Sequence, residues 1–240
     1  MGLSKKKNAK IEHIYASDIR MTSLKKQAEA LKVEVCFSNE ELVEKSDLLF
    51  ICIKPDQVKK ALKPLNLENK IIVSFAAGIF FEDLEEIIPD THHITMIPNT
   101  AMSVTEGIFV AENEHSLDAQ QLKTISQVLS KIGMIEFVDT KKMDIATVVA
   151  GCAPAFTAMF IEALADGACR YGLDRQTSYR LASKMVEGTG KMANIRQVHP
   201  GVLKDEVCSP KGSTIKGVTE LEKEGFRGAI IEAIDEIMDD

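Results

Sequence analysis

Apolar runs of strand length alternate with polar segments of helical spacing along the first 140 residues of the chain. The pattern predicts strands at 11–16, 33–37, 47–53, 70–75 and 93–97. It predicts helices between them, at 22–31, 39–45, 57–62 and 81–88. A repeat of strand, turn and helix is typical of a parallel sheet with crossover helices, so we expect an α/β, doubly wound, Rossmann-like domain over residues 1–140.

Strand signals stop after about residue 140. Helical patterns then cover 142–170, 175–194 and 219–238, and small residues such as Ala165, Gly167 and Gly188 permit close packing of helices. The sequence therefore predicts a second, all-helical domain over residues 141–240. Such a layout often buries its faces against another subunit, although an internal bundle would also satisfy it.

Composition and charge exclude several classes of protein. The chain has 240 residues and a net charge of −7, which argues against a nucleic-acid scaffold. We expect no membrane span, since no apolar run approaches ~20 residues, and no secretory signal at the N-terminus. The five cysteines are scattered without Cys-x-x-Cys spacing, which favours reduced thiols in the cytoplasm and no metal site.

The segment from Asp205 to Gly217 interrupts the helical pattern more sharply than any other part of the second domain. It holds one proline, two glycines (Gly212 and Gly217) and three hydroxyl side chains (Ser209, Ser213 and Thr214). A turn of this kind that opens a helix exposes backbone N–H groups to an anion. The alternative is a capped turn between two helices, with Ser209 or Ser213 as the N-cap.

Ligands of doubly wound folds bind outside the carboxyl ends of the strands. The segments expected there are Ser17-Asp18, Lys54-Pro55, Ala76-Ala-Gly78 and Pro98-Asn99-Thr100.

Several strings along the chain resemble, in order and spacing, the pyrroline-5-carboxylate reductase family. They are Asp47-Leu-Leu-Phe-Ile-Cys-Ile-Lys-Pro, Val73-Ser-Phe-Ala-Ala-Gly, Met96-Ile-Pro-Asn-Thr, Gly151-Cys-Ala-Pro-Ala-Phe, Glu162-Ala-Leu-Ala-Asp-Gly, Tyr171-Gly-Leu and His199-Pro-Gly with Asp205-Glu-Val-Cys-Ser-Pro-Lys-Gly-Ser-Thr. The resemblance runs from about Ile11 to Glu236. It implies an oxidoreductase that reduces 1-pyrroline-5-carboxylate to L-proline with NADPH or NADH, in the last step of proline biosynthesis.

The resemblance also implies a substrate site and an assembly. The substrate carboxylate would lie on the turn at Ser209, Gly212, Ser213 and Thr214, supplied across the interface of a homodimer or a ring-like homo-oligomer. Thr214 would lie near the ring nitrogen as the catalytic residue, where its hydroxyl can relay a proton but not generate one.

For the cofactor, the resemblance places Lys54 and Pro55 near the ribose and nicotinamide. It places Ala76, Ala77 and Gly78 where the dinucleotide approaches closely, and Asn99 beside the nicotinamide. At the end of the strand 11–16, Ser17 and Arg20 suit a ribose 2′-phosphate, whereas Asp18 suits a free 2′-hydroxyl. The choice between NADPH and NADH stays open.

Three departures from the family pattern bear on function. The family opens with a strand and a Gly-x-Gly-x-x-Gly turn that holds the pyrophosphate, and this sequence contains no such motif. Gly2-Leu3 would align with the end of the helix after that turn, so we expect an N-terminally incomplete sheet. Ala153 stands where the family has glycine, and Lys211 replaces the first glycine of the substrate turn.

These departures leave two alternatives to an active reductase. The first is a cofactor-impaired, non-enzymatic paralogue that keeps the helical dimer. The second is a related reductase with another substrate, which is less favoured because no lysine-base motif stands out in the second domain.

Overall fold

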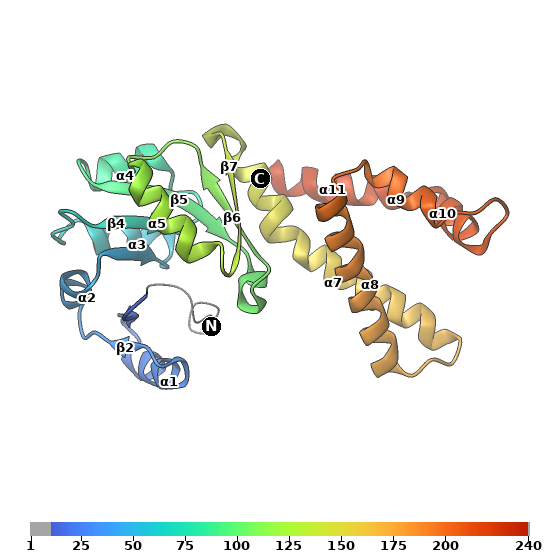
Figure 1. The fold of residues 1–240 in the computed structure, drawn as a ribbon, viewed down its shortest axis with the longest axis horizontal. Coiled ribbons are helices and arrows are strands. Elements are labelled where there is room, and N and C mark those ends of the chain that lie inside the picture. The colour runs from blue at the N-terminus through green and yellow to red at the C-terminus, as the bar shows by residue number, and fades with distance from the viewer. Residues whose placement is uncertain (1–10, 240) are drawn as a thin grey trace. The chain divides into compact units, whose positions relative to one another are not determined.

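The computed structural model describes residues 11–239 (Figure 1). The chain divides into two compact units, residues 1–151 and 152–240. The predicted boundary at 140 lies earlier, because Met143 and Ala150 pack with Val110 in a small core of the first unit. The expectation for Gly2-Leu3 lies outside the described residues.

The strands of the first unit form two separate sheets among the described residues. Their bounds are β1 (Tyr15–Ala16), β2 (Glu34–Val35), β3 (Leu48–Ile51), β4 (Ile71–Ser74), β5 (His92–Pro98), β6 (Gly107–Glu112) and β7 (Gly133–Val138). β1 and β2 pair only with each other, whereas the other five form one sheet in the order β3-β4-β5-β6-β7. Among the described residues, β1 and β2 are therefore not hydrogen-bonded to the sheet of β3 to β7.

The predicted strands 11–16 and 33–37 are each reduced to two paired residues. Tyr15 pairs with Glu34 and Ala16 with Val35 in parallel register. A strand persists only as far as it has a partner for its backbone groups, and one short neighbour supports only a short ladder.

The predicted parallel pairing is confirmed for β3, β4 and β5, but the sheet also contains β6 and β7, which were not predicted, and one of its pairs is antiparallel. β3, β4, β5 are parallel to one another, and β6 is parallel to β7, but β5 and β6 are antiparallel, with Met96 opposite Ala111. The link between β5 and β6 is only a short 3-10 helix, η2 (Thr100–Val104), and its neighbouring residues. Parallel neighbours need a long crossover connection, so this short link reverses the chain.

The helices of the first unit are α1 (Met21–Leu31), α2 (Asn39–Lys45), α3 (Pro55–Leu62), α4 (Phe81–Ile87), α5 (Ala119–Leu129) and α6 (Met143–Thr147), with a 3-10 turn η3 (Thr140–Lys142) before α6. Four of these helices follow the predicted pattern closely, α6 begins the helix predicted at 142–170, and α5 was not predicted. α2 begins after Ser38, whose side chain accepts a hydrogen bond from the Glu41 N–H, and α5 begins after Asp118, which forms a capping box with Gln121.

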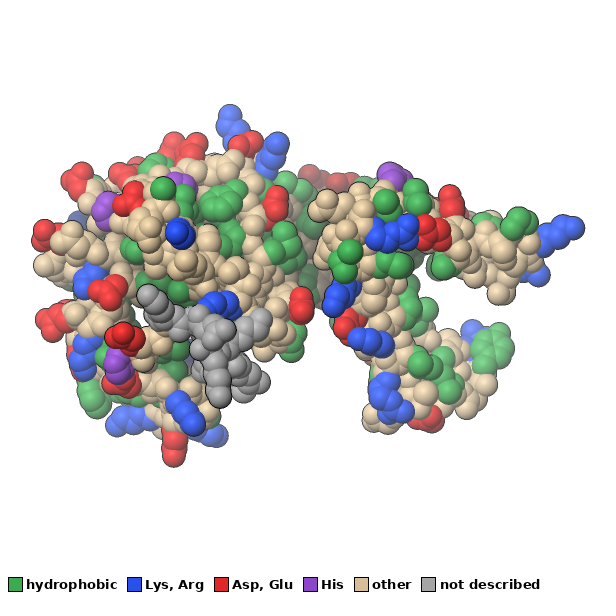
Figure 2. Space-filling view, viewed as in Figure 1, with side chains coloured by type: hydrophobic (Ala, Val, Ile, Leu, Met, Phe, Trp, Pro, Cys, Tyr) green, Lys and Arg blue, Asp and Glu red, His purple; other side chains and the backbone are tan. Residues whose placement is uncertain are grey.

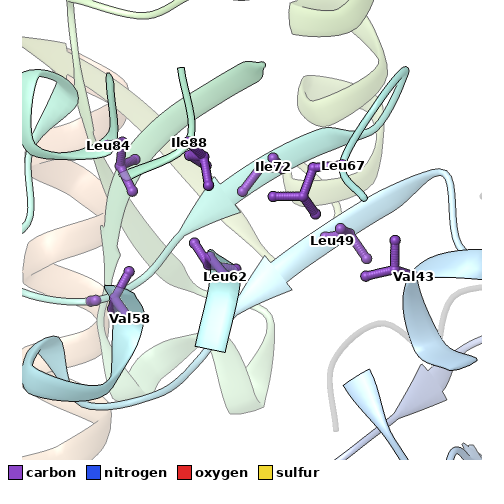
Figure 3. Packing of buried hydrophobic residues seen from close by; sticks show 9 residues of the cluster. Val43, Leu49, Val58, Leu62, Leu67, Ile72, Leu84 and Ile88 are labelled. Carbon is purple, nitrogen blue, oxygen red and sulfur yellow. The ribbon is translucent and has the colours of Figure 1, made fainter. Parts of the chain in front are cut away.

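Two hydrophobic clusters hold the five-stranded sheet. Figure 3 shows the first, in which Leu49 and Ile72 of the strands meet Val58, Leu62 and Leu84 of the helices. The second contains Phe109 and Met96 from the sheet and Ile125 and Leu129 from α5. Because these side chains are almost completely buried, the carboxyl ends of β3, β4 and β5 are held on a rigid support.

A pair of glycines lets β6 and β7 start side by side. Gly107 and Gly133 are register partners, and a Cβ on Gly133 would lie 2.4 Å from the Gly107 carbonyl oxygen. Only glycine fits there without a backbone shift.

The second unit is entirely helical among its described residues. Its helices are α7 (Ala153–Arg170), α8 (Arg175–Arg196), α9 (Pro200–Glu206), α10 (Ser213–Lys223) and α11 (Phe226–Met238), and a π turn (Val148–Cys152) precedes α7. The predicted single helix 219–238 is wrong, because α10 already starts at Ser213 and the chain breaks at Gly225, whose φ is 75°. Glycine adopts this left-handed conformation without steric cost.

Many apolar side chains of the helical unit are exposed, as the space-filling view also shows (Figure 2). The continuous helical stretch Thr140–Arg170 is long and apolar enough to cross a membrane by length and composition, contrary to the expectation from the length of the apolar runs. Only 17% of its most apolar window is buried within the single chain. One such helix is weak evidence for a membrane span, and helices that bury their faces against a second subunit share its composition.

Candidate active site

Two buried hydroxyl side chains form hydrogen bonds to the backbone of the turn after β4. The Ser74 hydroxyl accepts a hydrogen bond from the Ala76 N–H at 3.3 Å, and the Thr95 hydroxyl of β5 donates to the Ile79 carbonyl at 2.9 Å. Ala76 is buried, whereas Ala77 and Gly78 are exposed. Gly78 has a φ of 73°, and apart from its chain neighbours no atom of residues 11–239 lies within 4 Å of where its Cβ would be. The turn therefore offers a bare, rigid backbone at the strand ends, as expected for a close approach by a ligand.

Lys54 and Pro55 lie at the same edge of the sheet, after β3. Lys54 is the extended N-cap residue of α3, and Pro55 is the first residue of that helix. A proline fits this position because its missing N–H has no helical partner there. Both residues are exposed, so the ammonium group of Lys54 is available to an anion or a hydroxyl.

Asn99 follows β5 at this edge, but its side chain already has structural partners. Its Oδ1 accepts a hydrogen bond from the Ile108 N–H at 3.1 Å, and its Nδ2 donates to the Ala150 carbonyl at 3.0 Å. In a regular helix the Ala150 carbonyl would accept a hydrogen bond from the N–H of residue 154. Pro154 has no N–H, so the Asn99 side chain supplies a donor instead. Asn99 thus fixes the π turn beside the strand ends, and its role toward a cofactor stays a prediction.

Ser17 and Arg20 follow β1, in the two-stranded sheet, and Asp18 lies between them. The backbone N–H of Arg20 donates to Asp18 Oδ1 at 2.7 Å, and Arg20 Nη2 donates to Asp18 Oδ2 at 3.2 Å. These hydrogen bonds lower the pKa of Asp18, so it is ionised at neutral pH. The sequence suggested Asp18 as a partner for a ribose hydroxyl, but the ion pair between Asp18 and Arg20 was not predicted.

The turn before α10 adopts the backbone of a glycine-rich loop. Lys211 has a φ of 62°, in the left-handed region that favours glycine, although it carries a long side chain. Gly212 follows as the N-cap residue, and its N–H donates to the Ser209 carbonyl at 3.0 Å. A Cβ on Gly212 would lie 2.5 Å from Ser209 Oγ and 3.0 Å from the Ser209 carbonyl oxygen. The alternative in which Ser209 or Ser213 is the N-cap is therefore wrong, since glycine occupies that position.

A glycine N-cap has consequences for binding. The first N–H groups of a helix have no partner within it, and Gly212 has no side chain to cap those of α10. Ser213 and Thr214 are the first two residues of α10, and both side chains are exposed within the single chain. The arrangement suits a carboxylate, which would receive the free N–H groups at the positive end of the helix dipole.

The residues present fit parts of a nicotinamide dinucleotide. Lys54 and the backbone of 76–78 suit the nicotinamide and its ribose, and the Asp18–Arg20 pair suits the adenosine ribose. The sequence has no Gly-x-Gly-x-x-Gly turn, so the described residues do not supply the usual pyrophosphate cradle. In the described part of the chain, no group of three or more potential metal ligands occurs.

Sequence reasoning missed a buried carboxylate behind these strand ends. Glu112, at the end of β6, is fully buried and joins three elements that lie far apart in the chain. It accepts hydrogen bonds from the Phe81 N–H of α4 at 2.8 Å and from the Thr140 hydroxyl at 2.7 Å. Burial raises the pKa of Glu112, since removal from water disfavours the charged form.

We expect Glu112→Gln to flatten the pH dependence of the unfolding free energy. Because its pKa is raised in the folded state, Glu112 binds a proton more readily there than in the unfolded chain. Its ionisation therefore lowers stability as pH rises from its ordinary pKa of 4.5 through the raised folded value. Glutamine keeps an acceptor for the Phe81 N–H and has nothing to ionise. Denaturant unfolding from pH 4 to pH 8 measures this, with the exposed Glu136→Gln as control; parallel curves for Glu112→Gln and wild type would contradict the prediction.

The fold and these sites define a two-domain oxidoreductase of the nicotinamide-dependent class, with a Rossmann-like first unit and a helical second unit. Residues 2–78 match the family model described as NADP oxidoreductase coenzyme F420-dependent, and residues 140–240 match that of pyrroline-5-carboxylate reductase dimerisation. The chain belongs to the pyrroline-5-carboxylate reductase family.

Individual relatives support this assignment over most of the chain. A pyrroline-5-carboxylate reductase of Treponema pallidum is 41% identical and is aligned over 92% of this chain and 86% of its own. The solved pyrroline carboxylate reductase of Plasmodium falciparum, with NADP bound, is 30% identical with a TM-score of 0.77 and covers 85% of this chain and 79% of its own. The Streptococcus pyogenes reductase has a TM-score of 0.84 at 26% identity over 95% and 88%.

Proposed function

We propose that this protein reduces 1-pyrroline-5-carboxylate to L-proline with NADPH or NADH, in the last step of proline biosynthesis. The observation that carries the proposal is the turn Ser209–Thr214, an anion-binding backbone at the start of α10 in a chain of this family. The substrate is a small carboxylate with one reducible C=N bond. When bound, the reduced nicotinamide supplies the hydride that this bond needs at carbon.

The substrate carboxylate is proposed to lie on the N–H groups of Ser213 and Thr214. Gly212 leaves them open, and the positive φ of Lys211 turns the chain toward them. Ser209 supports the turn through its carbonyl and lies close enough to Gly212 to make any larger residue clash. Hydrogen bonds to a charged group are each worth about 1.5–3 kcal/mol, so two such donors give useful affinity for a small acid.

Thr214 is proposed as the residue that hands a proton to the ring nitrogen. In the first turn of α10 it has no helical carbonyl four residues back, so its hydroxyl is free to face a ligand. Thr219, in the middle of the same helix, instead donates to the Ile215 and Lys216 carbonyls. Reduction of the C=N bond needs one hydride at carbon and one proton at nitrogen, and a hydroxyl can relay that proton from water.

On the cofactor side, Lys54 and Pro55 are proposed to contact the nicotinamide ribose, with Ala76, Ala77 and Gly78 providing the close backbone approach. Ser17 and Arg20 belong to the adenosine end, after β1. Asn99 supports this edge through Ala150 and Ile108.

The helical unit belongs to a dimerisation family, which accounts for its exposed apolar side chains and for the apolar helix Thr140–Arg170. We propose a homodimer or a ring-like homo-oligomer in the cytoplasm, with no nucleic-acid or membrane partner. The five cysteines are scattered without Cys-x-x-Cys spacing, which favours a reducing compartment.

The non-enzymatic alternative is not favoured, because the relatives that cover most of the chain are named as reductases. The direct test follows absorbance at 340 nm while pyrroline-5-carboxylate is added to the protein with NADH or NADPH, and measures proline in the product. Oxidation of the dinucleotide in proportion to proline formed supports the proposal. Absence of both at saturating substrate contradicts it.

A further inference from the structure

The end of β1 carries a closed acid–base pair. Asp18 Oδ1 accepts the backbone N–H of Arg20 at 2.7 Å and its Nε–H at 3.3 Å, while Asp18 Oδ2 faces Nη2 at 3.2 Å. The side chain of Asp18 is 36% exposed and that of Arg20 is 78% exposed. Asp18 is thus anchored to the backbone just before α1, whereas Arg20 is held mainly by Asp18.

This geometry limits what Arg20 can offer to an anion. A guanidinium binds phosphate best through two parallel N–H donors on one edge. The Nε–Nη2 edge of Arg20 already faces the Asp18 carboxylate, so a phosphate must use the outer Nη1–Nη2 edge and lie beside a negative charge. A ribose 2′-hydroxyl is neutral, and it can donate to the carboxylate without displacing the guanidinium.

We propose that Asp18 is a specificity-determining residue that makes this protein prefer NADH over NADPH. This rests on the proposed reductase function and deepens it. Asp18 accepts the 2′-hydroxyl of the adenosine ribose and keeps Arg20 paired, so a 2′-phosphate meets repulsion and finds only part of its usual partner. The Plasmodium falciparum relative has NADP bound in its structure, so the preference is assigned to the residues of this chain and not to the family.

Dissociation constants for NADH and NADPH, measured by calorimetry on the full chain, test the preference without turnover. Wild type is expected to bind NADH about 10-fold more tightly. Asp18→Asn keeps an acceptor for the Arg20 N–H but removes the charge, and it should bring the ratio of the two constants to about 1 or below. Arg20→Ala added to Asp18→Asn should weaken NADPH binding again, since the freed guanidinium is lost.

Glu41→Gln is the matched control. Glu41 is another partly exposed carboxylate of the same unit that accepts a backbone N–H, from Phe37 at 2.8 Å, and pairs with a cation, Lys45. It should leave the NADH/NADPH ratio unchanged, and near-wild-type unfolding midpoints show that the variants fold.

Three results would overturn the proposal. They are a wild type that binds NADPH at least as tightly as NADH, an Asp18→Asn variant with an unchanged ratio, and a wild type that binds neither dinucleotide. Failure of the proposed reductase function would give a different result. A protein that shows the expected binding ratio but forms no proline from pyrroline-5-carboxylate would contradict the proposed substrate and leave the cofactor preference standing.

Discussion

Thr214→Ala is expected to lower kcat for reduction of pyrroline-5-carboxylate by about 10²-fold, at the lower end of what a positioned proton donor contributes. The alanine removes the hydroxyl proposed to pass a proton to the ring nitrogen, while the backbone N–H of residue 214 stays in place for the carboxylate. KM should therefore change much less than kcat. Steady-state rates over a range of substrate concentration separate the two constants.

Two further variants make that result specific. Thr214→Ser keeps a hydroxyl at the first turn of α10 and should restore most of kcat. Thr219→Ala removes a hydroxyl from the same helix that is engaged with the Ile215 and Lys216 carbonyls, and it should leave kcat unchanged. If Thr214→Ala turns over as fast as wild type, Thr214 has no part in the chemistry.

Gly212→Ala is expected to raise KM for pyrroline-5-carboxylate by about 10- to 100-fold. The added Cβ would lie 3.0 Å from the Ser209 carbonyl oxygen and 2.5 Å from its Oγ, so the backbone of the turn must move. A shift there misaligns the N–H groups of Ser213 and Thr214, and the loss of one charge-assisted hydrogen bond is worth about 1.5–3 kcal/mol.

Gly217→Ala provides the control within the same helix. Apart from its own helix and chain neighbours, no atom of the described residues lies within 4 Å of its added Cβ, and alanine favours an α-helix over glycine by about 1 kcal/mol. It should keep KM near the wild-type value and slightly raise the unfolding midpoint. Equal KM values for the two glycine variants would show that the turn before α10 does not bind the substrate.

The regular elements of the first unit up to β5 were largely predictable from local sequence, whereas β6, α5 and β7 were not predicted. The helix 39–45 appears with the predicted bounds, since Ser38 caps it and its apolar face is clear. The reversed β6 was not predictable from periodicity, because strand direction depends on the length of the connection and not on the strand itself. The two-residue strands β1 and β2 likewise depend on which neighbours are present, a property of the whole sheet.

Some features of the candidate site were also predictable from local sequence, and others were not. Glycines and hydroxyl residues marked the turn before α10, but the left-handed backbone at Lys211 runs against the preference of lysine and could not be inferred from its identity. Glu112 accepts hydrogen bonds from Phe81 and Thr140, which are distant in sequence, so no local motif predicts its role. The partners of Asn99 were hidden for the same reason, because Ala150 needs a donor only once Pro154 is placed four residues further along a helix.

The central claim is that hydride passes from the nicotinamide ring to the C=N carbon of pyrroline-5-carboxylate on this protein. NADH or NADPH that carries deuterium in the transferred position at C4, incubated with the protein and substrate, tests it directly by mass spectrometry of the product. We predict L-proline with one deuterium at C5 for each dinucleotide oxidised. Oxidation of the dinucleotide with no deuterium in proline, or no proline at all, would contradict the account.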